Sequence, residues 1–371
     1  MSNSSAHIVV CGAGVIGAAT AYFLTRRGAR VTIIEQDRPA CAASGKAGGF
    51  LALDWCDDTA LQALARRSFA LHAELAANLP DDYGYRRLQT WAATAHASAS
   101  HASASQPERA AAPDPDHPDW LNPQARVYAQ LGDERSTAQV HPQLFTEALL
   151  NAALRQGAQL LKGRVGGLEW RDKHLSGVRI DDTIMAADQV VLALGPWTSQ
   201  AASWLSLPPV FGLKGHSIVL KPRQPLGPAA LFVDFHGRRG EQLSPELFSR
   251  PDGDVYLCGL PEQSAVPDQP QQVQSDPASG AQLLDIAAAL SSNLAGLQPE
   301  RLQACYRPVT MDGLPFLGAV SDGVYLATGH SVWGILNAPA SGLALSELML
   351  DGQAHSIDLT PFDPIRLMNP A

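Results

Sequence analysis

The sequence predicts an α/β protein in which a Rossmann-like domain is interleaved with a second domain built on an antiparallel sheet. The chain begins with an apolar run, a glycine-rich turn and a helix-like stretch within residues 7–28. Apolar runs that end in glycine return at 188–195 and 323–329, which is typical of strands buried on both faces of a parallel sheet. Residues 210–260 contain short strand-like segments separated by prolines, which indicates an antiparallel sheet inserted between those runs.

The 371 residues are enough to bury the cores of two domains. Both domains are predicted to be discontinuous, because βα patterns and hairpin patterns alternate along the chain. We expect the first domain to comprise residues 1–60, 140–205 and 301–371, and the second to comprise residues 61–139 and 206–300.

Ala-Ser-His repeats and closely spaced prolines mark residues 91–119. This stretch has too little apolar surface to offset its ordering entropy, so we expect a mobile surface insertion. His96, His101 and His117 could be interpreted as metal ligands, but no cysteine or carboxylate lies nearby at ligand spacing, and we predict no metal. The five cysteines of the chain are never spaced as CxxC, which predicts reduced thiols rather than a zinc site or a disulfide framework.

Composition and charge argue against several classes of partner. Apolar residues make up 46% of the chain and charged residues 17%, as in a soluble globular protein. The net charge is −9 without any cluster of Lys and Arg, which argues against binding to nucleic acid or to anionic membranes. No apolar run is long enough to span a bilayer, and residues 1–6 lack the features of a signal peptide. We therefore expect a soluble, intracellular and cytoplasmic protein.

The first glycine-rich turn predicts a dinucleotide site, with an ordinary glycine-rich turn as the alternative. Gly12 lets the chain turn off the strand, Gly14 lets backbone approach a pyrophosphate, and Gly17 lets the next helix pack against the strand. That helix aims free amides and the positive end of its dipole at the phosphates. Glu35 ends the next apolar run, where its carboxylate would accept hydrogen bonds from a ribose diol and repel the 2′-phosphate of NADP.

Two further glycine-rich segments favour a flavin over a nicotinamide cofactor. Residues 43–49 supply a hydroxyl, an ammonium and bare backbone for the far phosphate and the ring system. Residues 329–339 lead into a helix with Pro339 in its first turn, and we expect this helix to continue over residues 341–350 and to end near Gly352. A helix N-terminus at the pyrimidine edge of a flavin would stabilise the anionic reduced ring. An NAD-dependent dehydrogenase stays an alternative, and it would be colourless, whereas a flavoprotein is yellow.

Taken together, these motifs resemble the FAD-dependent D-amino acid oxidase superfamily, most closely its glycine oxidase and sarcosine oxidase branch. The similarity covers nearly all of the chain except the Ala-Ser-His insertion. Five motifs in the family's order carry it: residues 12–17 with Glu35, then 43–49, 194–197, 307–315 and 329–339. The resemblance implies that the first domain binds FAD and that the second domain faces the substrate.

The resemblance also implies roles for single residues. Arg307 matches the arginine that holds the substrate carboxylate, a task that suits a planar guanidinium because it can donate two parallel hydrogen bonds. The alternative is an arginine that ties two loops together. His330 and Trp333 are expected near the flavin ring, or else as packed core residues. His216 and Glu246 are candidates to reach the pocket from the second domain, and as departures from the glycine oxidase pattern they leave the substrate open.

We expect FAD to be bound without a covalent bond. Sarcosine oxidases attach their flavin near the position of Cys305, whereas glycine oxidases have a small residue there and no such bond. A covalent link at Cys305 is the alternative, and a buried core thiol is the simplest role for this residue. The residues expected to contact FAD are Gly12, Gly14, Val15, Ile16, Gly17, Glu35, Gln36, Ser44, Gly45, Lys46, Ala47, Gly48, Gly49, Val165, Gly195, Trp197, Arg307, Gly329, Gly334, Ile335 and Leu336.

The predicted activity is oxidation of the C–N bond of a small amino acid or secondary amine. The α-hydrogen of the substrate would leave as hydride to the flavin, with Arg307 and His330 at the catalytic site, and water would hydrolyse the resulting imine. Oxygen is the expected electron acceptor. Two alternatives stay open: a dehydrogenase of the same fold with another acceptor, and an assembly or trafficking factor in which FAD stabilises the fold.

Overall fold

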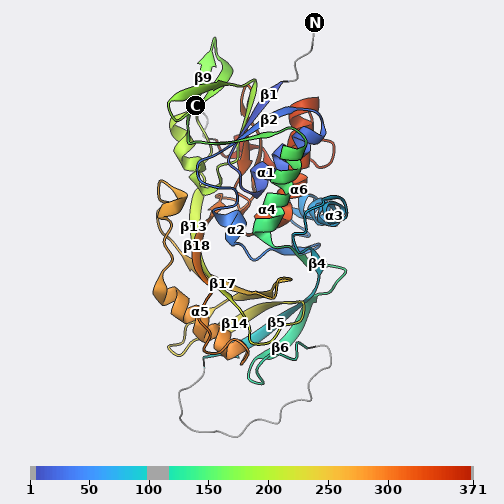
Figure 1. Ribbon diagram of the computed structural model, residues 1–371, viewed down its shortest axis with the longest axis vertical. Coiled ribbons are helices and arrows are strands. Elements are labelled where there is room, and N and C mark those ends of the chain that lie inside the picture. The colour runs from blue at the N-terminus through green and yellow to red at the C-terminus, as the bar shows by residue number, and fades with distance from the viewer. Residues whose placement is uncertain (1–5, 98–116, 369–371) are drawn as a thin grey trace.

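The computed structural model describes residues 6–97 and 117–368 and shows an elongated molecule with a sheet toward each end (Figure 1). One sheet runs in the order β19-β20-β12-β1-β2-β8, and its neighbouring strands are parallel except for β19 and β20. Its central strands are mostly apolar and buried, which is typical of parallel strands covered on both faces. The strands are β1 (His7–Cys11), β2 (Arg30–Glu35), β8 (Gln159–Lys162), β12 (Gln189–Leu192), β19 (Phe316–Ser321) and β20 (Val324–Thr328).

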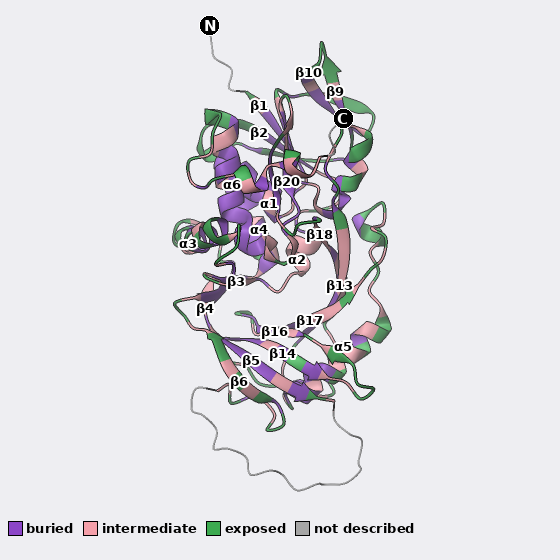
Figure 2. Cartoon of the chain, turned by 180° about the vertical axis from the view of Figure 1, so that it is seen from behind, coloured by how far each residue is buried: buried purple, intermediate pink, exposed green. Residues whose placement is uncertain are grey.

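A layer of buried helices covers this sheet (Figure 2). Helix α1 packs against α4 and α6, and α3 packs against α6. The approach of α6 to α1 depends on Gly342, where a Cβ would lie 2.6 Å from the backbone carbon of Ala19. The helices are α1 (Val15–Arg26), α3 (Gln62–Asn78), α4 (Pro142–Arg155) and α6 (Gly334–Asp351).

The second sheet runs in the order β18-β13-β17-β16-β14-β5-β6, with β15 paired to β14. Its pairs are antiparallel except for β14 and β5, which are parallel. Helix α5 packs against β13, β17 and β5. These elements are β5 (Gln89–His96), β6 (Arg126–Gly132), β13 (Phe211–Leu220), β14 (Ala229–His236), β15 (Gln242–Leu243), β16 (Glu246–Ser249), β17 (Val255–Glu262), α5 (Pro277–Leu290) and β18 (Arg301–Val309).

Two long strands of the second sheet and several short elements lie where the two domains meet. Strands β13 and β18 reach the first domain, where both contact η1 and β18 also contacts α2. Two small sheets run in the orders β3-β7-β4 and β11-β10-β9. The remaining elements are α2 (Ala43–Lys46), β3 (Phe50–Ala52), β4 (Arg86–Arg87), β7 (Thr137–Gln139), β9 (Val165–Arg171), β10 (His174–Ile180), β11 (Thr183–Ala186) and the 3-10 helices η1 (Gly195–Ser203), η2 (Pro270–Gln272), η3 (Ser331–Trp333), η4 (Thr360–Phe362) and η5 (Pro364–Leu367).

The insertion predicted for residues 91–119 begins too early in the sequence. Residues 91–96 belong to β5, which pairs with both β14 and β6, so the sheet orders this part of the chain. Residues 98–116, which include His101, lie outside the described residues. The ring of His96 stacks on that of His236 with centroids 4.7 Å apart, and His117 packs against Trp91.

Two elements belong to a different domain from the one predicted for their residues. Helix α3 was expected in the second domain, but its buried residues Leu64 and Phe69 belong to the apolar core of the first. Strand β18 was expected in the first domain, but it pairs with β13 along its whole length, from Val309 opposite Phe211 to Arg301 opposite Val219. Such long-range pairing leaves no mark in the local sequence pattern of a strand.

Helix α6 begins earlier than its sequence predicts. It starts at Gly334, so that Pro339 lies inside the helix rather than in its first turn. Its predicted end is confirmed, because Gly352 forms a left-handed C-cap with a φ of 79°.

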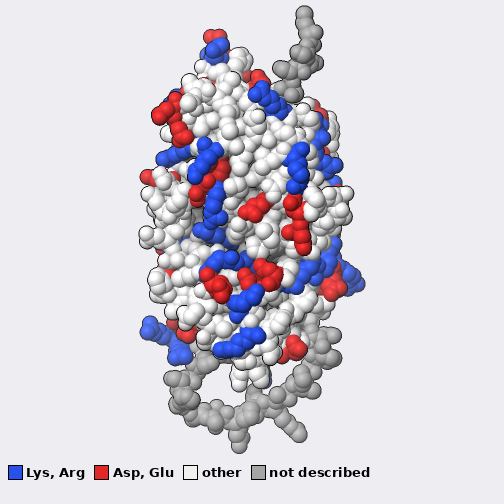
Figure 3. All heavy atoms as spheres, viewed as in Figure 1, with Lys and Arg blue, Asp and Glu red and all other residues white. Residues whose placement is uncertain are grey.

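The surface charge, the helices and the cysteines were also compared with the expectations from the sequence. Acidic and basic side chains are mixed over the face that Figure 3 shows. None of the helices in the described ranges is long and apolar enough to cross a membrane. All five cysteines lie within the described ranges and are free.

Candidate active site

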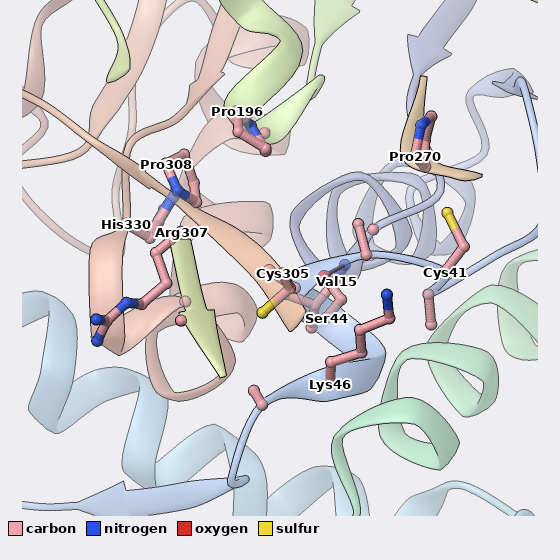
Figure 4. Close-up of a pocket in the computed structure, with 18 of the residues that line it drawn as sticks. Val15, Cys41, Ser44, Lys46, Pro196, Pro270, Cys305, Arg307, Pro308 and His330 are labelled. Atoms are coloured by element: carbon pink, nitrogen blue, oxygen red, sulfur yellow. Dashed lines mark hydrogen bonds between the residues drawn. The ribbon is translucent and has the colours of Figure 1, made fainter. Parts of the chain in front are cut away.

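A cavity of about 560 Å³ lies between the carboxyl ends of the parallel strands and the inner face of the second sheet. Such a volume is within the usual range of small-molecule sites. Figure 4 shows side chains from both domains around this cavity, among them Ser44 and Lys46 from the first and Cys305 and Arg307 from the second. In open α/β sheets, ligands bind outside the carboxyl ends of the strands, which is where the cavity lies.

The glycine turn after β1 forms one end of the cavity. Gly12 has a φ of 108°, and a Cβ there would lie 2.4 Å from the carbonyl oxygen of Ala193, so the turn requires glycine. Gly14 precedes α1 and has no side chain to cap it. Instead the N–H of Val15 donates to the hydroxyl of Ser44, 2.9 Å away, which joins the first glycine segment to the second.

Glu35 lies at the end of β2 on the cavity wall. Its carboxylate accepts hydrogen bonds from the N–H of Ala13 at 2.9 Å and from the N–H of Asp37 at 3.0 Å. Burial raises the pKa of this carboxyl group, while the two hydrogen bonds oppose the shift. The backbone amides thus hold Glu35 in one orientation beside the glycine turn.

His330 lies where β20 leads into η3 and α6, and it lines the cavity. Its Nε2 is 3.0 Å from the hydroxyl of Ser341, whereas its Nδ1 has no partner within the part of the chain that the structure describes. Burial lowers the pKa of His330 to about 3, so the ring is neutral at physiological pH. Gly334 and Ile335 at the uncapped start of α6 line the cavity beside it.

The second sheet contributes a wall of alternating residues. Tyr256 and Cys258 on β17, and Cys305 and Arg307 on β18, line the cavity because residues two apart in a strand share a face. Burial raises the pKa of both thiols and of the phenol. The phenol of Tyr256 donates to the backbone oxygen of Lys46 at 2.9 Å, which fixes α2 against this wall.

Lys46 approaches the same wall from α2. Its Nζ donates to the carbonyl oxygen of Ala304 at 3.0 Å, next to Cys305. The positive charges of Lys46 and Arg307 act to lower the pKa of the Cys305 thiol, but burial outweighs them. The histidine of β13, His216, is buried on the cavity wall, with its Nδ1 3.3 Å from the carbonyl oxygen of Leu260.

Most of the residues predicted to contact a cofactor lie together on this cavity. They come from segments far apart in the sequence and meet only in the fold. Those that line it are Gly12, Gly14, Val15, Ile16, Glu35, Gln36, Ser44, Lys46, Ala47, Gly48, Val165, Gly195, Trp197, Arg307, Gly334 and Ile335, together with the predicted catalytic His330. His216 and Glu246 also reach it from the second domain.

Five of the predicted residues do not line the cavity. A Cβ at Gly17, Gly45 or Gly49 would lie 2.0 to 2.1 Å from a backbone oxygen, so these glycines let segments pack closely behind the site. Gly329 has a φ of 83° in the turn after β20, and Leu336 is buried in the core. The glycine pattern marks these turns but does not distinguish packing from ligand contact.

Trp333, which was expected near the flavin ring or else as a packed residue, makes an aromatic contact in the structure. Its ring meets that of Trp55 edge to face, with centroids 6.4 Å apart, and Trp55 in turn contacts Phe50 and Phe232. Trp333 is not among the residues that line the cavity. It therefore belongs to an aromatic cluster between the two domains.

Sequence reasoning missed several residues of the second-domain wall. Tyr256, Cys258 and Ser217 lie on strands, and residues 242–244 comprise β15 and the residue that follows it. The alternation within β17 was an available signal for Tyr256 and Cys258. The sequence does not show which face of the sheet meets the cavity, because that depends on pairing between distant strands.

Comparison with known proteins identifies the family of the chain. A family model described as FAD-dependent oxidoreductase matches residues 7–348. The chain belongs to this family. Glycine oxidases are among the proteins to which the chain is similar.

Named relatives agree with this assignment. A putative oxidoreductase of Schizosaccharomyces pombe is 30% identical to this FAD-dependent oxidoreductase, over 98% of this chain and 99% of the relative. A glycine oxidase of Pseudomonas aeruginosa is 28% identical, over 97% of this chain and 99% of the relative. The solved structure of a glycine oxidase from Geobacillus kaustophilus has the same fold, with a TM-score of 0.79 and 23% identity over 98% of this chain and 100% of that one.

The cavity of this FAD-dependent oxidoreductase suits FAD on structural grounds. The glycine turn at Gly12 and Gly14 is a cradle that side chains would fill, and α1 begins there without a cap of its own. Glu35 would bind the ribose, and the backbone at Gly14 and the N-terminal end of α1 would face the pyrophosphate. The uncapped start of α6 and the unpartnered Nδ1 of His330 supply further polar atoms at the other end of the cavity.

Proposed function

We propose that this protein oxidises the C–N bond of a small amino acid or secondary amine, with Arg307 as the anchor of the substrate carboxylate. The observation that carries the proposal is the state of Arg307. Its guanidinium lines the cavity, yet it makes no hydrogen bond or ion pair with any residue in the described ranges. An arginine that tied two loops together would have such partners. A guanidinium with free donors is suited to grip a carboxylate with two parallel hydrogen bonds.

Bound FAD would supply the two-electron acceptor that takes the substrate's α-hydrogen as hydride. The chain's own residues bind and orient the substrate. Arg307 would hold the carboxylate, and the wall of Tyr256, Cys258 and Cys305 would exclude water from the reacting carbon. His330, neutral because burial lowers its pKa, would act as a hydrogen-bonding group rather than as a cation.

A substrate screen on the FAD-loaded protein tests the proposal. At least one member of a panel of amino acids and N-methyl amines should reduce the flavin anaerobically. With that substrate, Arg307→Ala should lower kcat/KM by roughly 10- to 100-fold, mainly through KM, because a charge-assisted hydrogen bond contributes about 1.5–3 kcal/mol. Arg307→Lys should retain part of the binding. Arg301→Ala is the matched control, because Arg301 lies on the same strand but pairs with Asp254 at the surface. Failure of every panel member to reduce the flavin would contradict the proposal.

Oxygen is the proposed acceptor. Support comes from the similarity in sequence to a glycine oxidase of Pseudomonas aeruginosa. After anaerobic reduction by substrate, admission of air should reoxidise the flavin within seconds and release hydrogen peroxide. Slow reoxidation in air that an artificial acceptor accelerates would instead identify a dehydrogenase.

We propose that FAD is held without a covalent bond. Burial raises the pKa of the Cys305 thiol, so it is a poor nucleophile at neutral pH. Denaturation in acid should therefore release all of the flavin into the supernatant. Flavin that stays with the polypeptide in the wild type but not in Cys305→Ala would establish the covalent alternative.

A further inference from the structure

Two opposite charges line the cavity without pairing with each other. Glu246 opens β16 and Arg307 lies near the end of β18, and both line the cavity. The charge of Arg307 acts to lower the pKa of Glu246, so the two groups interact electrostatically. However, no hydrogen bond or ion pair within 4 Å joins them in the described part of the chain. Each is therefore available to a ligand.

Few interactions offset the desolvation cost of the Glu246 carboxylate. Its one hydrogen-bond donor in the described residues is the thiol of Cys258, its cross-strand neighbour, with Sγ 3.9 Å from Oε2. A thiol is a weak donor, and a buried carboxylate normally has strong donors or a close cation. The charged and titratable groups that face Glu246 are Arg307 from β18 and Cys258 from β17, and on β14 its neighbour is Phe232. Burial outweighs the charge of Arg307 and raises the pKa of the carboxyl group.

A purely structural role does not explain this arrangement. If Glu246 served to neutralise Arg307, the two would form a close pair, because separated charges keep most of their desolvation cost. The arrangement suits a ligand with a carboxylate that can bind Arg307 and an ammonium group that can bind Glu246.

We propose that Glu246 binds the amino group of the substrate, so that the cavity recognises both ends of a zwitterionic amino acid. This inference rests on the proposed function, because it takes Arg307 as the carboxylate anchor. It narrows the substrate class to molecules with both groups. Simple amines lack the group for Arg307, and simple carboxylates meet the repulsion of Glu246.

Removal of the Glu246 charge has opposite effects on two kinds of ligand. In Glu246→Gln, a zwitterion loses the partner of its ammonium, so its affinity falls. A plain carboxylate is relieved of repulsion, so its affinity for Arg307 rises. General damage to the site would instead weaken both.

The test is calorimetric titration of the FAD-loaded protein with matched pairs of ligands. Glycine is paired with acetate, β-alanine with propionate and 4-aminobutyrate with butyrate, so that the members of each pair differ by the amino group. For at least one pair, the wild type should bind the zwitterion more tightly, and Glu246→Gln should weaken it by about tenfold or more while tightening the carboxylate by a few fold. Glu246→Asp, which retains the charge, should keep part of the preference. Glu169→Gln removes the same charge from a surface pair with Arg179 and should change neither affinity.

The outcomes separate this inference from the proposed function. If Arg307→Ala does not weaken the plain carboxylates, the carboxylate anchor is wrong and the proposed function fails with it. If Arg307→Ala weakens them but Glu246→Gln shifts both members of every pair in the same direction, or neither, the role of Glu246 alone is refuted. A wild type that prefers no zwitterion over its partner carboxylate refutes it as well. FAD content and thermal midpoint establish that each variant is folded.

Discussion

The Nε2 atom of His72 lies 3.0 Å from the carbonyl oxygen of Ile335 and 3.1 Å from that of Leu336. Pro339 has no N–H, so the carbonyl group of Ile335 lacks its usual donor four residues along α6. The N–H of Ala340 donates to the hydroxyl of a serine on α3. Helix α3 therefore satisfies the backbone that the proline disrupts, and it holds the first turn of α6 against the cavity.

This relationship predicts a loss of stability in mild acid. Since carbonyl oxygens only accept, His72 must be neutral with its hydrogen on Nε2, and burial lowers its pKa to about 4 from 6.5. The unfolded state then binds more protons between pH 4 and 6.5, so the free energy of unfolding falls as pH decreases through that window. The slope from one such group approaches about 1.4 kcal/mol per pH unit. His330, with a pKa of about 3, adds a similar contribution over a wider window.

Urea unfolding at saturating FAD between pH 4.5 and 7.5 measures this effect. His72→Gln keeps a donor near the two carbonyl groups but does not titrate, so its stability should depend less steeply on pH. Equal slopes in His72→Gln and the wild type would show that protonation of His72 does not contribute.

Ser44 links two glycine segments, which predicts a combined defect in stability and in FAD binding. In Ser44→Ala, the N–H of Val15 loses its acceptor 2.9 Å away at the start of α1. We expect a loss of about 1 kcal/mol in the free energy of unfolding, as for other helix caps, and weaker FAD affinity because the two segments of the site are no longer joined. Ser346→Ala is the control: that hydroxyl donates to the carbonyl oxygen of Leu343 inside α6, away from the cavity. The control should lose stability without losing FAD affinity. Equal FAD affinity in Ser44→Ala and the wild type would contradict the prediction.

The nucleotide-binding half of the site was predictable because its determinants are local. Gly12, Gly14 and Glu35 occupy consecutive βα elements, and their spacing alone indicates a turn, a helix start and a strand end that meet at one sheet edge. Ser44 and Gly195 follow the same logic, since each comes soon after a strand of the parallel sheet. In this half of the site, residues close together in the sequence are also close together in the fold, so the motif predicts the geometry.

The substrate-facing half was predictable only in part. Arg307 was predicted through resemblance, but its segment was assigned to the first domain, because the pairing of β18 with β13 is a long-range contact that the local sequence does not show. Tyr256 and Cys258 were missed for the same reason. Gly17 and Gly45 do not line the cavity and are closely packed, because a glycine pattern records tight packing as readily as ligand binding.

Gly17 should therefore be essential for packing rather than for contact with FAD. A Cβ at this position would lie 2.0 Å from the backbone oxygen of Gly12, which cannot move without displacing the cradle. Gly17→Ala should cost about 2 kcal/mol or more in the free energy of unfolding and reduce FAD uptake as a consequence. Gly166→Ala is the control, because a Cβ there would meet nothing within 4 Å. Chemical denaturation and FAD titration of the two variants measure the difference. Wild-type stability in Gly17→Ala would mean that α1 tolerates the displacement.

The thiol of Cys305 reports on the charges at the junction of the two domains. Burial raises its pKa, and the charges of Lys46 and Arg307 oppose that shift. In the FAD-free protein, alkylation of Cys305 by iodoacetamide should therefore be slower at pH 7.5 than alkylation of free cysteine, and it should accelerate as pH rises. Lys46→Met removes one of the opposing charges and should slow the reaction further, whereas Lys46→Arg should preserve the rate. Peptide mapping by mass spectrometry resolves Cys305 from the other four thiols. If Lys46→Met reacts as fast as the wild type, the ammonium that donates to the carbonyl oxygen of Ala304 does not influence the thiol.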